Sequence, residues 1–118
     1  MASAQIGELT MPTATVTIAA GQSLSTTLDL TAGSLAQLLA PDVWSPANVS
    51  FQLSADGLAF GDLYDVNGAE VVRAMGASRG VAIDPALTAA ALYLKVRSGS
   101  SEHPVVQDAD RTFVCVMV

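Results

Sequence analysis

The stretch Val49–Tyr64, VSFQLSADGLAFGDLY, decides the predicted fold. In its first half, apolar residues alternate with serine and glutamine, which is the two-residue period of a half-buried strand. The pair Asp56-Gly57 then tolerates the positive φ angles of a tight turn. A second strand follows, in which Phe60 and Tyr64 are expected to be large anchoring side chains. The stretch therefore predicts a β-hairpin at the centre of an all-β domain.

Alternation of apolar and polar residues predicts further strands on both sides of this hairpin. The turn at Gly21-Gln22 indicates that the first two of these strands form a hairpin of their own. The segment Ser34–Ala40 is ambiguous, because its leucines fit either one turn of an amphipathic helix or a strand. Pro85 follows Asp84 as a cap, which predicts a short helical turn through Thr88. The predicted strands are Thr13–Ala20, Leu24–Leu30, Val71–Met75, Val81–Ile83, Ala91–Arg97 and Thr112–Val118.

Several segments carry a prediction about burial. In Ala91–Arg97 the alternation predicts two sets of side chains. Leu92, Leu94 and Val96 are expected to face inward, and Tyr93, Lys95 and Arg97 are expected to face outward. Thr112–Val118 is apolar on both faces, so it is expected to be central in its sheet or covered by another subunit. Ser98–Asp110 is long and polar, which predicts an exposed loop. Trp44 lies in a proline-bounded loop, Pro41–Ala47, and its ring is expected to cover the core.

Together these elements predict one all-β domain. It is expected to be an antiparallel β-sandwich, jelly-roll-like, of about eight strands with one or two short helical turns. Residues 13–118 form this domain, and residues 1–12, which lack periodicity, form an N-terminal arm. The length of 118 residues suits a single domain that buries a core without disulfides.

The net charge of −6 is unevenly distributed along the chain. Residues 1–72 contain seven acidic and no basic residues, a charge of −7, whereas residues 73–118 contain five basic and four acidic residues, a charge of +1. Nucleic-acid binding requires clustered basic side chains, so no nucleic-acid partner is expected. The chain is 51% hydrophobic and only 14% charged, which predicts that apolar surface is buried against a partner as well as in a core.

The sequence also bears on the cellular compartment. No apolar run approaches the ~20 residues of a membrane helix, so no membrane association is expected. The N-terminus lacks the basic and apolar regions of a secretion signal, and Cys115 is the only cysteine, which excludes an internal disulfide. Synthesis in a reducing cytoplasm is the expectation that follows.

Three groups of residues are candidates for chemistry, and none has the context that its chemistry requires. Gly76–Gly80 fits the G-x-S-x-G pattern of a nucleophile elbow, but a strand is predicted where that motif needs a helix. His103 has no second histidine with which to share a metal. The oxygen ligands between Asp56 and Asn67 suit calcium, but their spacing is not that of an EF-hand. The sequence therefore predicts no enzyme activity, no cofactor and no bound metal.

From about residue 35 onward, the chain resembles a family of small β proteins from the structural gene clusters of tailed bacteriophages. No single piece of the likeness is diagnostic, but the order of the pieces is distinctive. The resemblance implies a component of the virion rather than an enzyme. The pieces are Pro41-x-x-Trp44-x-x-Ala47-x-Val49-x-Phe51-Gln52-x-Ser54-Ala55-Asp56-Gly57, Asp62-Leu63-Tyr64-Asp65, Ala82-Ile83-Asp84-Pro85, Tyr93-Leu94-Lys95-Val96-Arg97-Ser98-Gly99, Pro104-Val105 and Ala109-Asp110-Arg111-Thr112.

A second, looser likeness is to galactose-binding-like jelly rolls. It rests on a Ser-x-Asp-Gly-x-x-Phe hairpin at Ser54–Phe60 and on a Tyr-x-Lys-x-Arg strand at Tyr93–Arg97. This likeness implies a carbohydrate-binding module, with Trp44, Tyr64 or Tyr93 as the sugar platform.

The expected function is that of a capsid decoration, or cement, protein. Made in the host cytoplasm, it is expected on the capsid exterior of the virion, where it binds the major capsid protein and stabilises the lattice. The main alternative is a neck, tail or head-spike adaptor. Binding to further copies of itself is also an expectation. The arm, the Pro41–Ala47 loop and the Ser98–Asp110 loop are the expected contact regions, with the partner-binding residues Ile6, Leu9, Met11, Trp44, His103 and Val105.

Overall fold

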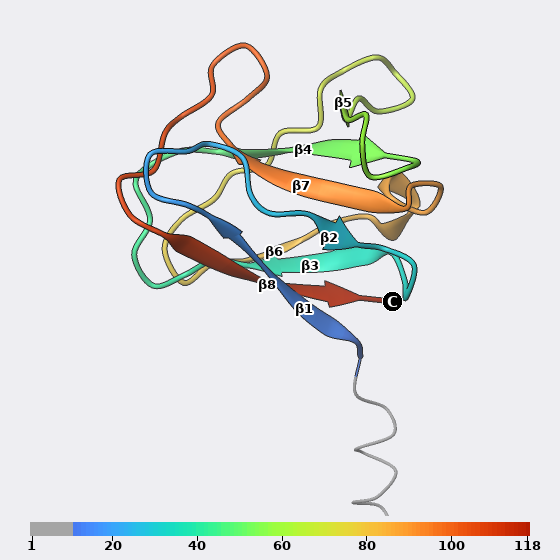
Figure 1. Cartoon of the computed structure of the whole chain (residues 1–118), viewed down its shortest axis with the longest axis horizontal. Coiled ribbons are helices and arrows are strands. Elements are labelled where there is room, and N and C mark those ends of the chain that lie inside the picture. Colours follow the sequence, from blue (N-terminus) through green and yellow to red (C-terminus); the bar gives the residue numbers. More distant parts are fainter. Residues whose placement is uncertain (1–10) are drawn as a thin grey trace, which may run out of the picture.

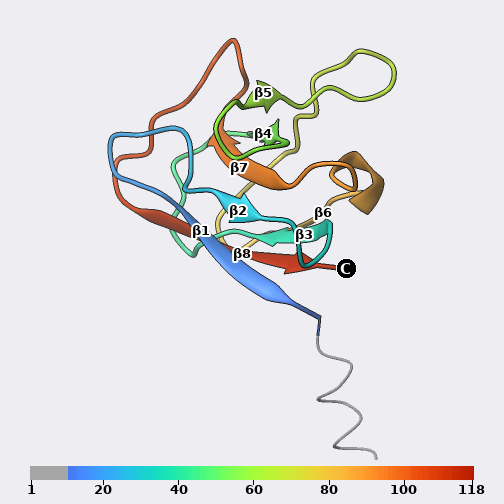
Figure 2. The same ribbon diagram turned by 45° about the vertical axis from the view of Figure 1, so that its right-hand side comes forward.

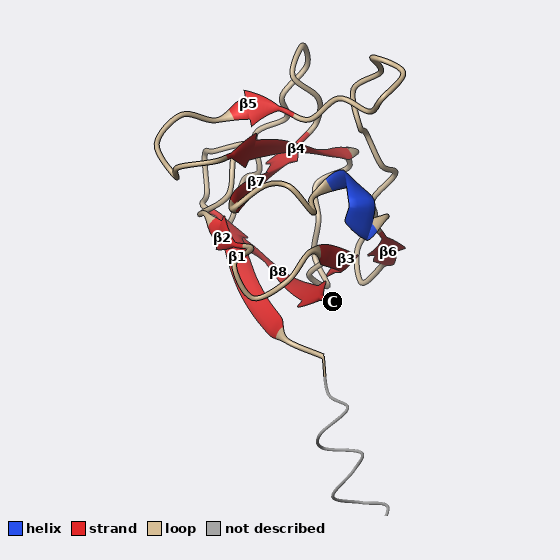
Figure 3. Ribbon diagram, turned by 90° about the vertical axis from the view of Figure 1, so that its right-hand side faces the viewer, coloured by secondary structure: helices blue, strands red, loops and turns tan. Residues whose placement is uncertain are grey.

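The computed structural model describes residues 11–118 and confirms the predicted antiparallel β-sandwich (Figure 1). Sheet A has the strand order β1-β8-β3-β6, and sheet B has the order β2-β7-β4-β5. Figure 3 shows the two sheets as two layers seen end-on. The strands are β1 Thr13–Ile18, β2 Leu28–Asp29, β3 Leu35–Leu39, β4 Val49–Ser54, β5 Gly61–Asp62, β6 Gly80–Ala82, β7 Tyr93–Ser98 and β8 Arg111–Met117.

The core lies between the inner faces of the two sheets. Phe51 of β4 and Phe113 of β8 are its largest fully buried side chains. Trp44 closes the core from the Pro41–Ala47 loop: its ring meets Phe113 edge-on at 5.2 Å between centroids, and its indole N–H donates to the Ala47 carbonyl at 3.0 Å. With 8% of its surface exposed, Trp44 is the predicted lid of the core.

Strand β8 is central in sheet A, as its apolar composition predicted. It pairs with β1 from Thr13↔Val116 to Ile18↔Arg111 on one side and with β3 on the other. Its burial alternates, however, so that Val114 on the outer face is 37% exposed while Phe113 and Cys115 are fully buried. The strand is thus paired along both edges, but in the single chain only one of its faces is covered.

The ambiguous segment Ser34–Ala40 is a strand, β3, with an irregularity. The register against β8 shifts between Leu35 and Gln37, which marks a bulge at Ala36. One extra residue reverses the alternation of side chains, so Leu35 and Leu38, three positions apart, are both fully buried. The helix-like spacing of these leucines is therefore the spacing of a bulged strand.

The predicted hairpin between the first two strands is wrong. After Ile18 the chain leaves sheet A, and the segment from Ser23 to Leu30 runs along β7 in sheet B, where only Leu28–Asp29 is regular strand. Ser25 is buried there, and its hydroxyl accepts a hydrogen bond from the Val96 N–H at 2.9 Å. A hairpin-like contact survives at the isolated bridge Ile18↔Ser25, next to which the Thr17 carbonyl accepts the Thr26 N–H at 2.9 Å.

The central hairpin exists, but its second strand is short. β5 pairs with β4 through Gln52↔Asp62 and Leu53↔Gly61, and the turn between them is a six-residue loop rather than a tight turn. Tyr64 is not an anchor, because it is 52% exposed and the neighbouring Leu63 is buried in its place.

Two further predictions, one of a strand and one of burial, are wrong. Val71–Met75 forms only an isolated bridge, Val49↔Arg73, although both of its end residues are buried. Leu92 lies before β7 and is 45% exposed instead of facing inward. Arg97 lies on the outer face, as predicted, but is only 5% exposed, because its guanidinium is paired with Asp62 and Glu70.

The predicted helical turn is confirmed. It is the 3-10 turn η1, Pro85–Leu87, capped by the Asp84 carboxylate, which accepts the Ala86 N–H at 3.0 Å. η1 is the sole helical element in residues 11–118. That part of the chain contains no helix of the length and apolarity needed to cross a bilayer.

Candidate interaction surfaces and the polar clusters that hold them

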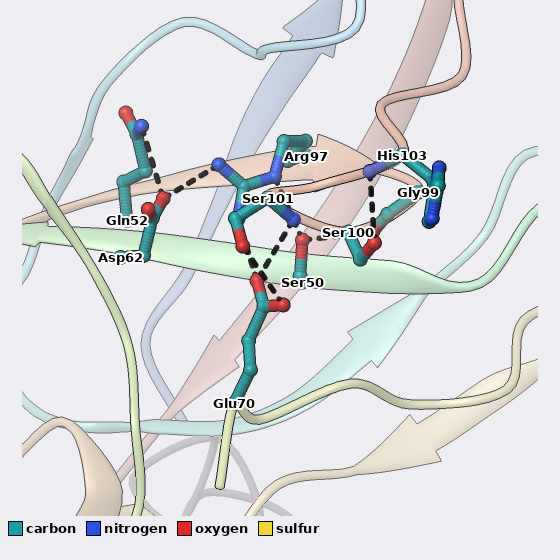
Figure 4. Close-up of polar contacts among 9 residues, drawn as sticks. All are labelled: Ser50, Gln52, Asp62, Glu70, Arg97, Gly99, Ser100, Ser101 and His103. Carbon is teal, nitrogen blue, oxygen red and sulfur yellow. Dashed lines mark hydrogen bonds and ion pairs between the residues drawn. The ribbon is translucent and has the colours of Figure 1, made fainter. Parts of the chain in front are cut away.

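Arg97 is the centre of a polar cluster on the outer face of sheet B (Figure 4). Its guanidinium donates to Asp62 Oδ1 at 2.7 Å, to Glu70 Oε2 at 2.8 Å and to Ser50 Oγ at 2.9 Å. Ser50 is fully buried, and its hydroxyl donates in turn to the Gly99 carbonyl at 2.8 Å. All three guanidinium nitrogens of Arg97 are therefore engaged, which is the arrangement that offsets the desolvation of a buried cation.

This Arg97 cluster joins sheet B to two of its loops. Glu70 ends the hairpin at Tyr64–Glu70, and its carboxylate also accepts the N–H and the hydroxyl of Ser101 at 2.9 and 3.0 Å. The cluster therefore fixes that hairpin and the Gly99–Pro104 turn relative to β7. Its groups face one another rather than a hollow, so the geometry supports a structural role.

Asp62 makes the Arg97 cluster sensitive to acid. The hydrogen bond from Arg97 holds the pKa of the Asp62 carboxyl below its ordinary value of 3.8. A carboxyl with a folded-state pKa below its unfolded-state pKa contributes stability above the unfolded value, and this contribution is lost as pH falls through the folded value.

We therefore expect an Asp62→Asn variant to lose less stability on acidification than the parent chain does. The free energy of unfolding, measured in urea from pH 6 down to pH 3, is expected to fall less steeply for the variant. Asp42→Asn is the control, because the Asp42 carboxylate is exposed and makes no hydrogen bond within residues 11–118. Equal slopes for Asp62→Asn and the parent chain would contradict the assignment.

A second polar cluster is centred on Gln107, which is fully buried. Its amide oxygen accepts the Ser45 N–H at 3.0 Å and the Arg111 Nε–H at 3.1 Å, and its amide nitrogen donates to the Ser45 carbonyl at 3.1 Å and to Ser98 Oγ at 2.8 Å. Arg111 in turn donates to Asp108 at 2.6 Å. Gln107 thus ties the Pro41–Ala47 loop to the loop that follows β7, and the predicted exposed loop Ser98–Asp110 is anchored near its C-terminal end.

The residues predicted to bind a partner lie on different segments and differ in their exposure. Ile6 and Leu9 lie outside the described residues. Met11 lies two residues before β1 and is 52% exposed, and Trp44 is packed in the core. His103 is exposed at the Gly99–Pro104 turn, where its N–H donates to Ser100 Oγ at 3.2 Å. Val105 is half-buried, and its N–H donates to the Ser98 carbonyl at 2.8 Å.

The candidate calcium ligands are occupied by turn hydrogen bonds. Asp56 accepts the N–H groups of Leu58 and Ala59 at 2.8 and 3.0 Å, and these bonds lower the pKa of its carboxyl. Asp65 accepts those of Asn67 and Ala69 in the same way. In residues 11–118, no group of three or more His, Cys, Asp and Glu side chains is placed to hold a metal ion.

The Gly76–Gly80 motif also has the local structure expected of a turn. Ser78 has a positive φ of 59°, and its N–H donates to the Pro41 carbonyl at 2.8 Å. Strand β6 begins at Gly80, where a nucleophile elbow would start a helix.

A small hollow opens on one side of the sandwich, beside η1. It has a volume of about 250 Å³ and is lined by alanine, leucine and one serine, with no charged side chain. Its wall consists of Leu53, Ser54, Ala55, Ala86, Leu87, Ala90 and Ala91.

The outer face of sheet A is a surface that the sequence analysis did not identify. The only charged residue in its four strands is Arg111, which is buried and paired with Asp108, whereas the strands of sheet B contain four charged residues. Register and alternation place valines and a leucine along the middle of the face and threonines along β1. We call these residues the uncharged face: Thr13, Thr15, Thr17, Gln37, Leu39, Gly80, Ala82, Thr112, Val114 and Val116.

Gly80, at one edge of this face, has no side chain, and neighbouring side chains occupy the space next to it. A Cβ at Gly80 would lie 2.9 Å from Leu39 Cδ2 and 3.0 Å from Gln37 Nε2, so both side chains lean over the glycine. The leucine thereby remains next to Val114, its partner in the register with β8. The uncharged face is thus an open sheet surface with an apolar centre, in a protein whose net charge is −6.

Comparison of the chain with protein-family models, with curated proteins and with solved structures found no match.

Proposed function

We propose that this chain is a structural protein of a tailed-bacteriophage virion, and specifically a capsid decoration protein that binds the outer surface of the major capsid lattice. The observation that carries the proposal is the uncharged face of sheet A. An exposed apolar sheet surface without charges is typical of a protein-binding surface. The order of family-like segments from Pro41 to Thr112 supports the choice of a phage virion.

The two sides of the sandwich fit a protein that lies on a lattice. The uncharged face is suited to rest on the capsid, because burial of its apolar area contributes about 25 cal/mol per Å². The loops of sheet B carry exposed acidic side chains such as Asp56 and Glu102, and these would face solvent. In this arrangement the protein's contribution is mechanical: many copies bridge neighbouring capsid subunits and resist the pressure of packaged DNA.

The alternatives differ in the support they receive. A neck, tail or head-spike adaptor would use the same uncharged face, and copy number separates it from a decoration protein: hundreds of copies per particle against about a dozen. Carbohydrate binding has less support, because Trp44 is buried against Phe113 and Tyr93 is half-buried. Of the three proposed sugar platforms, Tyr64 is the exposed one.

We expect Val114→Glu to abolish binding to heads while the fold is retained. The side chain lies in the middle of the uncharged face and is already 37% exposed, so a charge there is tolerated in the free protein but is desolvated in the complex. A desolvation cost of a few kcal/mol corresponds to a loss of affinity of at least about tenfold. The measurement is co-sedimentation with tailless heads of the phage that encodes the chain.

Val66→Glu is the matched control, because Val66 is fully exposed at the tip of a loop on sheet B. It makes the same chemical change on the other side of the sandwich and is expected to bind heads like the parent chain. If the parent chain fractionated with detached tails and not with tailless heads, decoration of the capsid would be ruled out.

A further inference from the structure

One edge of sheet A, the outer edge of β1, has backbone groups that find no partner within residues 11–118. The Pro12 carbonyl points toward β8, where it accepts the Met117 N–H at 2.9 Å. The Thr17 N–H and carbonyl point away from β8 and form hydrogen bonds with Thr26. Because backbone groups alternate along a strand, Thr13 and Thr15 also direct their N–H and carbonyl groups away from β8. No hydrogen bond to these four groups is formed within residues 11–118.

This edge also lacks the features that shield edges in monomeric proteins. Strand β1 contains no charge and no proline, and its register against β8 is unbroken over six residues. Natural edge strands usually carry a lysine, a proline or a bulge, or are very short. The other edge strands of the sandwich, β2, β5 and β6, are only two or three residues long. Figure 2 shows β1 at the margin of the molecule with one side open.

We propose that β1 pairs with β1 of a second copy of this chain, antiparallel, about a two-fold axis at Ala14. In this register Thr13 of each copy lies opposite Thr15 of the other. Each such pair exchanges two N–H to carbonyl hydrogen bonds, which satisfies all eight unpaired groups of the two edges. The pairing ends at Thr17, where Thr26 already occupies the edge.

The arrangement of the edge favours a second copy as the partner, because the outward N–H and carbonyl groups of Thr13 and Thr15 are spaced symmetrically about Ala14. Two chains with a net charge of −6 each repel one another, so contact between copies is least opposed where the surface carries no charge. Strand β1 and the face beside it are such a surface. In the proposed dimer, the side chains that become neighbours on the outer face are threonines. Threonine pairs across adjacent strands contribute favourably to the stability of a sheet.

The pairing has a consequence for the size of the uncharged face. The four strands of sheet A are three to seven residues long and together cover roughly 350 Å² of flat area, which is small beside the ~800 Å² of surface that each partner buries in a typical stable interface. Pairing through β1 joins two such faces into one eight-stranded surface. The inference does not depend on the proposed function, since it concerns only the free protein.

The register is tested by disulfide trapping with the full chain. Thr13→Cys and Thr15→Cys proteins, mixed and mildly oxidised, are expected to give disulfide-linked dimers, because Thr13 lies opposite Thr15 of the other copy. Either protein alone is expected to give much less, and Thr112→Cys, on the same face but in the central strand, none. Cys115 does not compete, because burial raises the pKa of its thiol to about 12. A mixture that cross-links no better than Thr112→Cys would overturn the proposal.

The unmodified protein gives a second, independent readout. Sedimentation velocity at increasing concentration is expected to show dimers for the full chain and monomers for Thr15→Pro, whose missing N–H is not one that bonds to β8. Circular dichroism establishes that the proline variant is folded, and the trapping experiment decides the matter if it is not. If the full chain stayed monomeric and removal of residues 1–10 made it associate, the arm would cover the edge of its own chain, and the proposal would be overturned.

Discussion

Replacing Arg97 with alanine is expected to lower the free energy of unfolding by about 3 kcal/mol. The reason is not the loss of three hydrogen bonds alone. Without the guanidinium, the carboxylates of Asp62 and Glu70 remain next to each other on sheet B, with 33% and 15% of their side chains exposed. Removing one partner of a largely buried ion pair costs more than the pair contributes, because the remaining charge is left desolvated.

Lys95→Ala is the matched control for this prediction. Lys95 lies two residues before Arg97 on the same outer face of β7, and its ammonium is 4.5 Å from the centroid of the Phe60 ring. The substitution removes the same charge from the same strand, but the interaction lost is worth only about 0.5 kcal/mol. Urea unfolding of both variants provides the comparison, and equal losses would show that Arg97 acts only through its net charge.

Amide hydrogen exchange gives the same experiment a local readout. The Ser101 N–H donates to Glu70 at 2.9 Å, and Glu70 is oriented by Arg97. Exchange at Ser101 is therefore expected to accelerate in Arg97→Ala and to stay slow in Lys95→Ala. Arg97→Lys keeps the charge but lacks the fork of donors that reaches Asp62, Glu70 and Ser50 together, so its loss of stability is expected to lie between the two.

The sequence predicted the architecture well where one strand could be read by itself. Alternation located β1, β4 and β7, and a continuous apolar run located β8, each to within two residues, and capping chemistry located η1. Each of these features is local, since a two-residue period or an Asp-Pro cap is complete within one segment. The apolar composition of β8 predicted that the strand is central or is covered by another subunit, and the strand order shows that it is central.

Pairings between segments were predicted less well, because they depend on distant residues. No feature within Leu24–Leu30 indicates that this segment pairs with β7, some seventy residues later, rather than with β1. The bulge in β3 also hid a pairing, since it placed Leu35 and Leu38 on one face and thereby gave the strand a helix-like spacing of leucines. In both places the missing information was the partner strand.

The candidate surface was missed for a related reason. The threonines of β1 and the valines of β8 are visible as alternate residues, but their union into one uncharged face requires the strand order. Attention to residue types led instead to Trp44 and His103, of which the first fills the core. A signal was available in the sequence: both segments lack charge at every outward position, in a chain that is acidic as a whole.

The second large effect is expected at Gln107. Gln107→Leu keeps the volume of the side chain but removes its four hydrogen bonds, and leaves the Ser45 N–H, the Ser45 carbonyl, Ser98 Oγ and Arg111 Nε without that partner. Each buried polar group left unpaired costs about 1–3 kcal/mol. Because Ser45 lies at the surface end of the cluster and can be reached by water, we expect a total loss of about 3 kcal/mol in the free energy of unfolding.

Two further variants separate hydrogen bonding from packing at this site. Gln22→Leu makes the same substitution at an exposed position and is expected to change the stability by less than about 0.5 kcal/mol. Gln107→Glu retains an acceptor for Ser45 and Arg111 but loses both donors, so its stability is expected to lie between those of the parent chain and Gln107→Leu. Amide exchange at Ser45 should follow the same order. If Gln107→Leu were no less stable than Gln22→Leu, packing alone would hold the Pro41–Ala47 loop, and the hydrogen bonds of Gln107 would be incidental to its position.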